Sequence, residues 1–176
     1  DECAALDAMI ADGLTGDVLI LTGGVSVGEY DLVGAALLRA GCEVLFHTVS
    51  MRPGKPILAA KRGACLVLGL PGNPISAFTG FQVFVRPVLR KLMGDPQPVA
   101  GPLRATLLTP LRRKPGRLTY HLAHLRWHEG KPLVAPVASA SSGDVLSLVR
   151  ANAFIVAPGD AQAIPAGAEV DVLAWE

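Results

Sequence analysis

The stretch that decides the fold covers residues 17–41 and reads DVLILTGGVSVGEYDLVGAALLRAG. Its first six residues form an unbroken apolar run, which is typical of a strand buried on both faces. Apolar residues at helical spacing over residues 31–40, followed by a glycine, predict a helix and its end. A glycine-rich turn joins the two predicted elements. Its glycines are Gly23, Gly24 and Gly28.

The segments on either side of this stretch predict an α/β fold. Residues 3–13 have helical spacing, and residues 42–47 (CEVLFH) read as a second strand. Helix and strand therefore alternate, as in a doubly wound parallel sheet. Residues 57–70 read as two strands around a turn. A helix then starts at the PGNP turn and extends to about Met93, with a kink expected at Pro87 because proline cannot donate a backbone hydrogen bond.

The second half of the chain has a different character. A segment rich in proline and glycine, GDPQPVAGP at 94–102, predicts a linker. Beyond it, short apolar stretches separated by turns predict a small all-β domain, either a barrel or a sandwich. The expected architecture is a parallel-sheet, three-layer α/β domain over residues 1–93, the linker 94–102 and a barrel-like β domain over residues 103–176.

Composition limits the class of protein. The chain has 176 residues, 51% of them apolar, and a formal charge of +1, so no general attraction to nucleic acid or membrane is expected. No apolar run is long enough to span a membrane. Three widely spaced cysteines without a pairing pattern fit a reducing, cytoplasmic compartment. Because the first residues read as a helix already under way, without an initiator methionine, we expect the C-terminal part of a longer protein.

The glycine-rich turn is the first candidate site. Backbone N–H groups exposed by its glycines suit a phosphate, and the spacing matches neither a P-loop nor the dinucleotide fingerprint. Ser26 adds a hydroxyl donor, while Glu29 and Asp31 lie near the start of the predicted helix. Asp31 and Glu29 are therefore interpreted as caps, metal ligands or acid–base groups. The alternative is a plain β–α turn with a capping aspartate.

Two further turns carry donors. In MRPGKP (51–56), prolines present Arg52 and Lys55 rigidly, which suits an oxyanion. The alternative is a solvated basic turn. In LPGNPIS (70–76), Asn73 suits the cap and Pro74 the first position of a helix, and Ser76 adds a hydroxyl. Here the alternative is an ordinary capped helix.

The joint placement of these turns favours a ligand that carries phosphate. All three are expected to follow strands of one α/β sheet, where ligands bind outside the carboxyl ends of the strands. A zinc site at His121, His124 and His128 is disfavoured, because on a strand His121 points away from the other two histidines.

Four segments taken in order, TGGVSVGEYD, MRPGKP, GLPGNPISA and PGRLTY, resemble the molybdopterin molybdenumtransferase family, which includes the MoeA proteins and the gephyrin E domain. The resemblance covers the second half of the family's molybdopterin-binding domain and its C-terminal β domain. It implies an enzyme of molybdenum cofactor biosynthesis that inserts molybdate into adenylylated molybdopterin and releases AMP. It also implies Mg²⁺ as the cofactor.

The resemblance assigns roles to individual residues. Asp31, Arg52 and Lys55 become catalytic residues, with Asp31 also a ligand of the metal. Molybdate is expected to bind Arg52, Lys55 and Ser142. The residues expected to bind the pterin nucleotide are Gly23, Gly24, Ser26, Gly28, Glu29, Pro71, Gly72, Asn73, Pro74 and Ser76.

The chain departs from the family pattern at two positions. Thr48 stands where a basic residue is common, and Leu122 stands where the family typically has an arginine. Arg117 and Arg126 are candidates to replace that arginine, although Arg126 needs a bend in the strand to reach the same place. These departures support an alternative, a pterin-binding scaffold without molybdate chemistry. A second alternative is the related adenylyltransferase, against which the β domain and MRPGKP argue.

The family also predicts how the protein works in the cell. The resemblance implies small-molecule substrates and a homodimer, with contacts to the upstream adenylyltransferase and to molybdoenzymes as further candidates. No nucleic acid or membrane is expected as a partner.

Overall fold

The computed structural model describes residues 2–25, 32–99, 101–112, 115–139, 141, 143–160 and 163–175. The chain divides into two compact units. The first unit comprises Asp1–Val49 and Gly54–Phe81, and the second comprises Ser50–Pro53 and Gln82–Glu176. Among the described residues, no helix has the length and apolar character that crossing a bilayer requires.

The first unit contains a four-stranded sheet with the strand order β1-β5-β4-β2. Its strands are β1 (Val18–Thr22), β2 (Glu43–His47), β4 (Leu58–Arg62) and β5 (Cys65–Leu70). The predicted α/β class is confirmed, but the sheet is mixed: β1 is parallel to β5, whereas β4 is antiparallel to β5 and β2. The physical reason is the tight turn around Gly63 (φ +58°), since only antiparallel neighbours can be joined by so short a connection.

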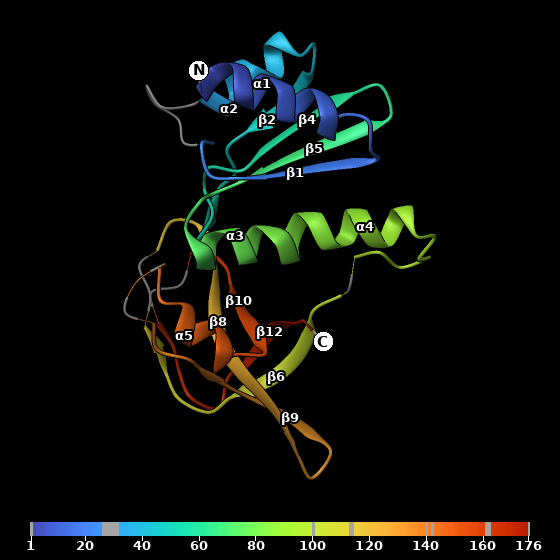
Figure 1. The fold of residues 1–176 in the computed structure, drawn as a ribbon. Helices are drawn as coiled ribbons and strands as arrows, with labels where there is room; N and C mark the ends of the chain where they lie inside the picture. Colours follow the sequence, from blue (N-terminus) through green and yellow to red (C-terminus); the bar gives the residue numbers. More distant parts are fainter. Residues whose placement is uncertain are drawn as a thin grey trace. The chain divides into compact units, whose positions relative to one another are not determined.

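Helices cover both faces of this sheet, as the three-layer prediction required (Figure 1). On one face lie α1 (Glu2–Gly13) and α2 (Leu32–Arg39), joined by a bidentate contact between Arg39 and Asp7. On the other face lies α3 (Pro74–Gly80), where a Cβ added to Gly80 would lie 2.9 Å from the side chain of Leu70. The core under α1 and α2 consists of Ile10, Val25, Val33, Ala36, Leu37, Cys42, Leu58, Ala60 and Val67.

The helix that begins at Pro74 changes its winding before Pro87. A π-helical segment, η1 (Phe81–Val85), follows α3, and α4 (Arg86–Leu92) follows η1. Proline cannot donate to the carbonyl four residues earlier, and a π-helical insertion is one way in which a helix changes its hydrogen-bond register. The sequence predicts a kink here, and the structure shows the change of winding directly before the proline.

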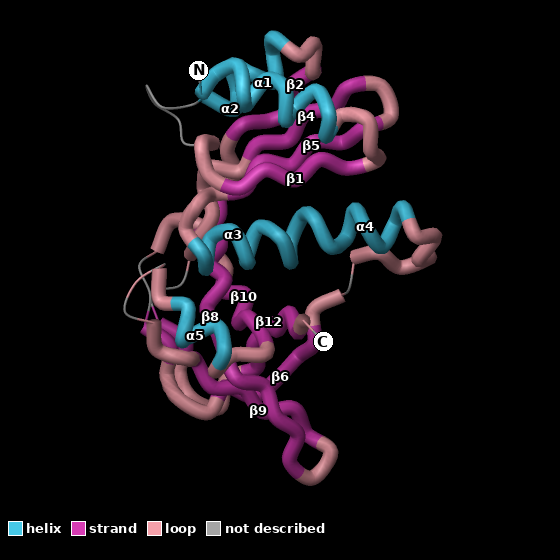
Figure 2. The backbone as a smooth tube through the Cα atoms, in the orientation of Figure 1, coloured by secondary structure: helices cyan, strands magenta, loops and turns pink. Residues whose placement is uncertain are grey.

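The second unit is built around a closed barrel of five strands in the order β10-β12-β6-β9-β8, closed by the pairing of β8 with β10 (Figure 2). Its strands are β6 (Leu103–Leu107), β8 (Leu118–His128), β9 (Lys131–Pro136), β10 (Ala153–Ala157) and β12 (Glu169–Ala174). A separate ribbon pairs β7 (Leu111–Arg112) with β11 (Ala163–Ile164). The predicted barrel is therefore confirmed.

Two elements of the second unit differ from expectation. Met51 and Arg52, predicted as part of a loop, form the short strand β3 (Met51–Arg52), which pairs in parallel with β8. A short helix, α5 (Val145–Val149), follows Asp144, whose side chain accepts a hydrogen bond from the backbone of Ser147. Five residues are too few to show a helical period, which explains why the sequence did not predict α5.

Candidate functional site

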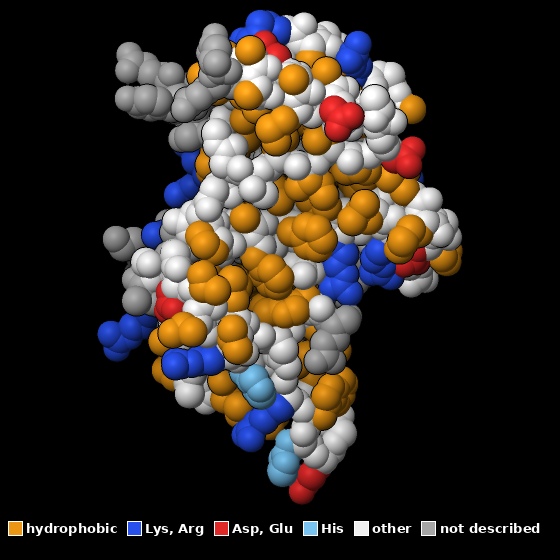
Figure 3. Space-filling view, in the orientation of Figure 1, with side chains coloured by type: hydrophobic (Ala, Val, Ile, Leu, Met, Phe, Trp, Pro, Cys, Tyr) orange, Lys and Arg blue, Asp and Glu red, His pale blue; other side chains and the backbone are white. Residues whose placement is uncertain are grey.

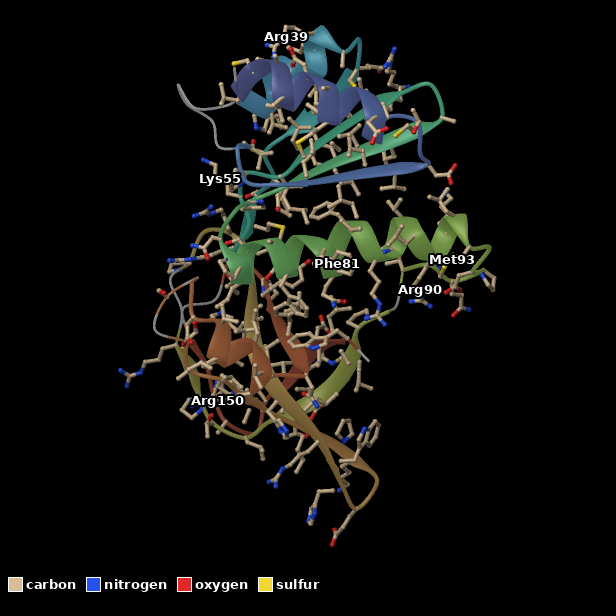
Figure 4. The ribbon with its side chains drawn as sticks, viewed as in Figure 1. Arg39, Lys55, Phe81, Arg90, Met93 and Arg150 are labelled. Carbon is tan, nitrogen blue, oxygen red and sulfur yellow. The ribbon has the colours of Figure 1, made fainter. Side chains whose placement is uncertain are left out.

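Loops that carry the predicted donors meet at one edge of the first unit's sheet. Because β4 is antiparallel to both neighbours, β1, β5 and β2 run in one direction and end at the same edge, where β4 begins. We call this the carboxyl edge. Ligands of α/β sheets bind at such edges. Figure 4 shows Lys55 at the end of the sheet where β1 finishes.

The glycine loop and the PGNP turn come together at this edge. Thr22 pairs with Leu70, so β1 and β5 end level with each other. The backbone N–H of Gly23 donates to the carbonyl of Leu70 at 2.9 Å. A Cβ added to Gly72 would lie only 3.3 Å from the Cα of Gly23. An alanine at position 72 would therefore require the glycine loop to shift by a few tenths of an ångström.

The glycine loop is anchored again at Val25. This side chain is 1% exposed, and a Cβ added to Gly69 of β5 would lie 2.7 Å from its Cγ1. The imidazole Nε2 of His47 lies 3.1 Å from the carbonyl oxygen of Val25. Gly23 and Gly24 have φ angles of +83° and +67°, which favour glycine. The described part of the loop, residues 23–25, is thus held at both ends.

The segment after β2 lies against the chain around Lys55. The N–H of Thr48 donates to the carbonyl of Ile57, and the N–H of Val49 donates to the carbonyl of Lys55, both at 3.0 Å. Thr48 has a φ angle of +134°, which is strained for a β-branched residue. Lys55 itself is exposed. Of the two cations in MRPGKP, it is the one that belongs to the first unit.

The start of α3 presents two polar side chains beside Pro71 and Gly72. Asn73 occupies the cap position and Pro74 the first turn, but the Asn73 side chain makes no capping hydrogen bond. Both residues lie where the sequence predicts them, and the Asn73 side chain is exposed. Ser76 is 7% exposed.

The remaining predicted cation belongs to the second unit. Arg52 is exposed and pairs in register with Thr119 of β8. Arg117, named as a replacement for the arginine absent at position 122, donates from Nη1 to the carbonyl of Met51 at 3.4 Å. Leu122 is 5% exposed and pairs with Phe154 of β10.

Arg126 lies in another part of β8, because the strand pairs with β10 up to Ala123 and with β9 beyond it. Of the two candidate replacements, Arg117 is therefore the one that lies beside MRPGKP.

Several predicted residues lie outside the described part of the chain. They are Ser26, Gly28, Glu29, Asp31 and Ser142. Within the described residues, no group of three or more histidine, cysteine, aspartate or glutamate side chains gathers as metal ligands would.

Two residues of the carboxyl edge were not predicted as site residues, namely His47 and Val25. A signal for His47 existed, because it is a polar residue at the end of a predicted strand, where α/β proteins place functional groups. The contact with Val25 had no local signal, since it joins residues 22 apart in sequence.

A separate pocket of about 500 Å³ lies in the second unit. Arg86, Arg90 and Tyr120 are part of its lining, and burial raises the pKa of the Tyr120 hydroxyl. None of the predicted site residues lines it.

Comparison with known proteins matches the chain to two protein-family models. The family described as "Probable molybdopterin binding domain" matches residues 1–91, and "MoeA C-terminal region (domain IV)" matches residues 104–175. A molybdopterin molybdenumtransferase of Bacillus subtilis (strain 168) is 40% identical over 158 residues, covering 89% of this chain and 36% of the relative. One of Staphylococcus aureus (strain Mu50) is 32% identical over 160 residues, covering 91% and 38%.

A solved structure of a molybdopterin biosynthesis MoeA protein from Pyrococcus horikoshii has a TM-score of 0.79 and 28% identity, covering 97% of this chain and 40% of that one. The chain thus spans about two fifths of the length of these relatives.

Proposed function

Because the chain belongs to the molybdopterin-binding domain family, we propose that it is the C-terminal part of a molybdopterin molybdenumtransferase. The proposed reaction takes adenylylated molybdopterin and molybdate, cleaves the adenylate with release of AMP, and transfers molybdenum to the dithiolate. The observation that carries the proposal is the close approach of Gly23 and Gly72 at the carboxyl edge, the edge at which Figure 4 also shows Lys55.

Anion binding is what this edge offers chemically. Gly24, Gly72 and Asn73 are exposed residues with a backbone N–H group, and Lys55 adds a positive charge. The N–H of Gly23 is already bonded to the carbonyl of Leu70. Preorganised donors of this kind bind phosphate and stabilise charge that develops on a leaving phosphate. In our proposal the loops at Gly23–Val25 and Pro71–Ser76 hold the phosphates of the pterin nucleotide.

Molybdate is a tetrahedral dianion and calls for cations together with hydroxyl donors. We assign Arg52 and Lys55 to this role, with Ser142 as a hydroxyl donor and Asp31 as a catalytic residue. Ser26, Gly28 and Glu29 complete the proposed pterin-nucleotide loop. The contact between Arg117 and the carbonyl of Met51 supports Arg117 as a further cation for the residues around Arg52.

Mg²⁺ is part of the proposal only through Asp31, which lies outside the described residues. The described side chains do not by themselves form a cluster of metal ligands. No step is therefore routed through the metal, and the roles above belong to the chain's own donors.

Charge removal in the full-length protein tests the proposal. Arg52→Ala and Lys55→Ala are each expected to lower molybdate-dependent AMP release by about tenfold or more, as loss of one preorganised donor does. The matched control is the double variant Lys61→Ala, Arg62→Ala, which removes two exposed positive charges from the opposite end of β4. Activity that survives in the Arg52 and Lys55 variants but falls in the control contradicts the proposed site.

A scaffold without molybdate chemistry is the second candidate, favoured by Thr48 and by the buried Leu122. Leu122, at the position where the family carries an arginine, is 5% exposed and lies on the face of β8 opposite Ala123 and Leu125, which pack in the barrel core. Calorimetric titration of the full-length protein with molybdate separates the two. The transferase is expected to bind molybdate specifically, and the scaffold is not.

Further features of the family are proposed with the function. We expect a homodimer in the cytoplasm, with the linker at 94–102 between the two domains. The spacing of Cys3, Cys42 and Cys65 shows no disulfide framework, which supports a reducing compartment. The upstream adenylyltransferase and molybdoenzymes are the proposed protein partners.

A further inference from the structure

We propose that His47 is a positioning residue, which holds the glycine loop through Val25 and links that loop to the backbone at Lys55. The inference rests on the proposed function, since it concerns how the two anion-binding loops of the same edge keep their geometry. His47 does not itself bind the ligand in this account. It acts through the backbone that it holds.

The hydrogen bond indicates that the Nε2 atom of the His47 imidazole carries a proton. A carbonyl oxygen only accepts, so the Nε2 atom of His47, 3.1 Å from the Val25 oxygen, must carry the proton. His47 is the last residue of β2 and pairs with Leu58 of β4. The imidazole is therefore attached to the sheet, and the carbonyl that it contacts belongs to the glycine loop.

The loop is held firmly at the point where His47 contacts it. The Val25 side chain is almost completely buried and fills the space left by Gly69 of β5. At its other end, the loop is attached by the hydrogen bond from Gly23 to Leu70. With His47, three contacts define residues 23–25.

The residues that follow His47 extend the link to Lys55. Thr48 and Val49 donate their N–H groups to the carbonyls of Ile57 and Lys55, respectively. Thr48 keeps its strained φ of +134° between these contacts, and strained backbone persists only where surrounding structure determines it. Residues 47–49 therefore join the glycine loop on one side to the Lys55 segment on the other.

Such a link matters because anion sites depend on donors that are already in place. Loops that must reorganise on binding lose affinity, and small displacements of donors weaken charge stabilisation. Removing the His47 N–H donor is expected to loosen the Val25 carbonyl and with it residues 23–25. The ligand affinity should then fall by about tenfold, the ratio that corresponds to one lost hydrogen bond.

The test uses the full-length protein and adenylylated molybdopterin as the probe, titrated calorimetrically in the absence of molybdate. His47→Leu cannot donate a hydrogen bond, whereas His47→Gln keeps an N–H donor on a side chain of similar reach. The matched control, His128→Leu, makes the same replacement on the exposed β8–β9 hairpin of the second unit, where Figure 3 shows basic and histidine side chains in solvent.

We expect about tenfold weaker binding for His47→Leu, and binding within about threefold of the unmodified protein for both His47→Gln and His128→Leu. Unchanged affinity in His47→Leu overturns the inference, as does a glutamine variant as weak as the leucine variant. If His47→Leu does not fold, His47→Met replaces it as the variant without a donor. Failure of the unmodified protein to bind the probe contradicts the proposed function itself, and is thereby distinguished from failure of the positioning role.

Discussion

Thr48→Gly is expected to stabilise the protein, although it removes a side chain. A β-branched residue at φ +134° carries strain of about 1–3 kcal/mol, which glycine does not. Against this, glycine adds about 0.5–1 kcal/mol of conformational entropy to the unfolded chain. Thr48 is exposed, so little burial is lost. The net gain in the free energy of unfolding is about 1 kcal/mol.

Amide hydrogen exchange of peptides from β4 and β5 in the full-length protein measures this gain in the first unit. A gain of about 1 kcal/mol slows the exchange of globally protected amides about fivefold. Thr48→Ala is the matched control, because alanine loses the same hydroxyl and methyl groups but keeps the Cβ and therefore most of the strain. If the glycine variant is no more stable than the alanine variant, the assignment of strain to Thr48 is refuted.

Three further predictions concern the loops, the acid stability and the barrel. Gly72→Ala is expected to weaken binding of adenylylated molybdopterin, because its Cβ would lie 3.3 Å from the Cα of Gly23 and the glycine loop would have to shift by a few tenths of an ångström; calorimetric titration checks this. A hydrogen bond from the Gln97 backbone, and then Arg90, lower the pKa of Asp95, so its contribution is present above about pH 4 and lost as the pH falls through the lowered folded pKa. The stability difference between the natural protein and Asp95→Asn should therefore shrink on acidification. Phe154→Ala should cost about 3–5 kcal/mol in urea unfolding, since this side chain is fully buried against Tyr120 and Trp175.

Local sequence patterns predicted most elements of the fold. Continuous apolar runs identified β1 and β5, and glycines marked the ends of α1 and α2, because burial and chain termination act within a few residues. Direction and pairing were harder. The alternation of helix and strand indicated a parallel sheet, and the two strands predicted around the turn at Gly63 form an antiparallel pair within it. Strand pairing depends on which segments meet in space, and no local period encodes that.

The candidate site was predicted in its chemistry and only partly in its geometry. The residues of the glycine loop and of the PGNP turn were named from their backbone freedom and their donors, and β1 and β5 end level at one edge. The residues of MRPGKP are divided between units, with Arg52 on β3 and Lys55 in the first unit. Arg52 and Lys55 are three residues apart, and this spacing does not indicate to which unit each residue belongs.

What the sequence determined by itself is therefore most of the elements, the order of the anion-binding motifs and the family to which they point, since each depends on neighbouring residues. Only the tertiary structure decided that Gly23 approaches Gly72, and that His47 contacts the carbonyl of Val25. These contacts join residues 49 and 22 positions apart. They exist because three strands end at one edge, and a hydrogen bond across that edge has no counterpart in the local sequence.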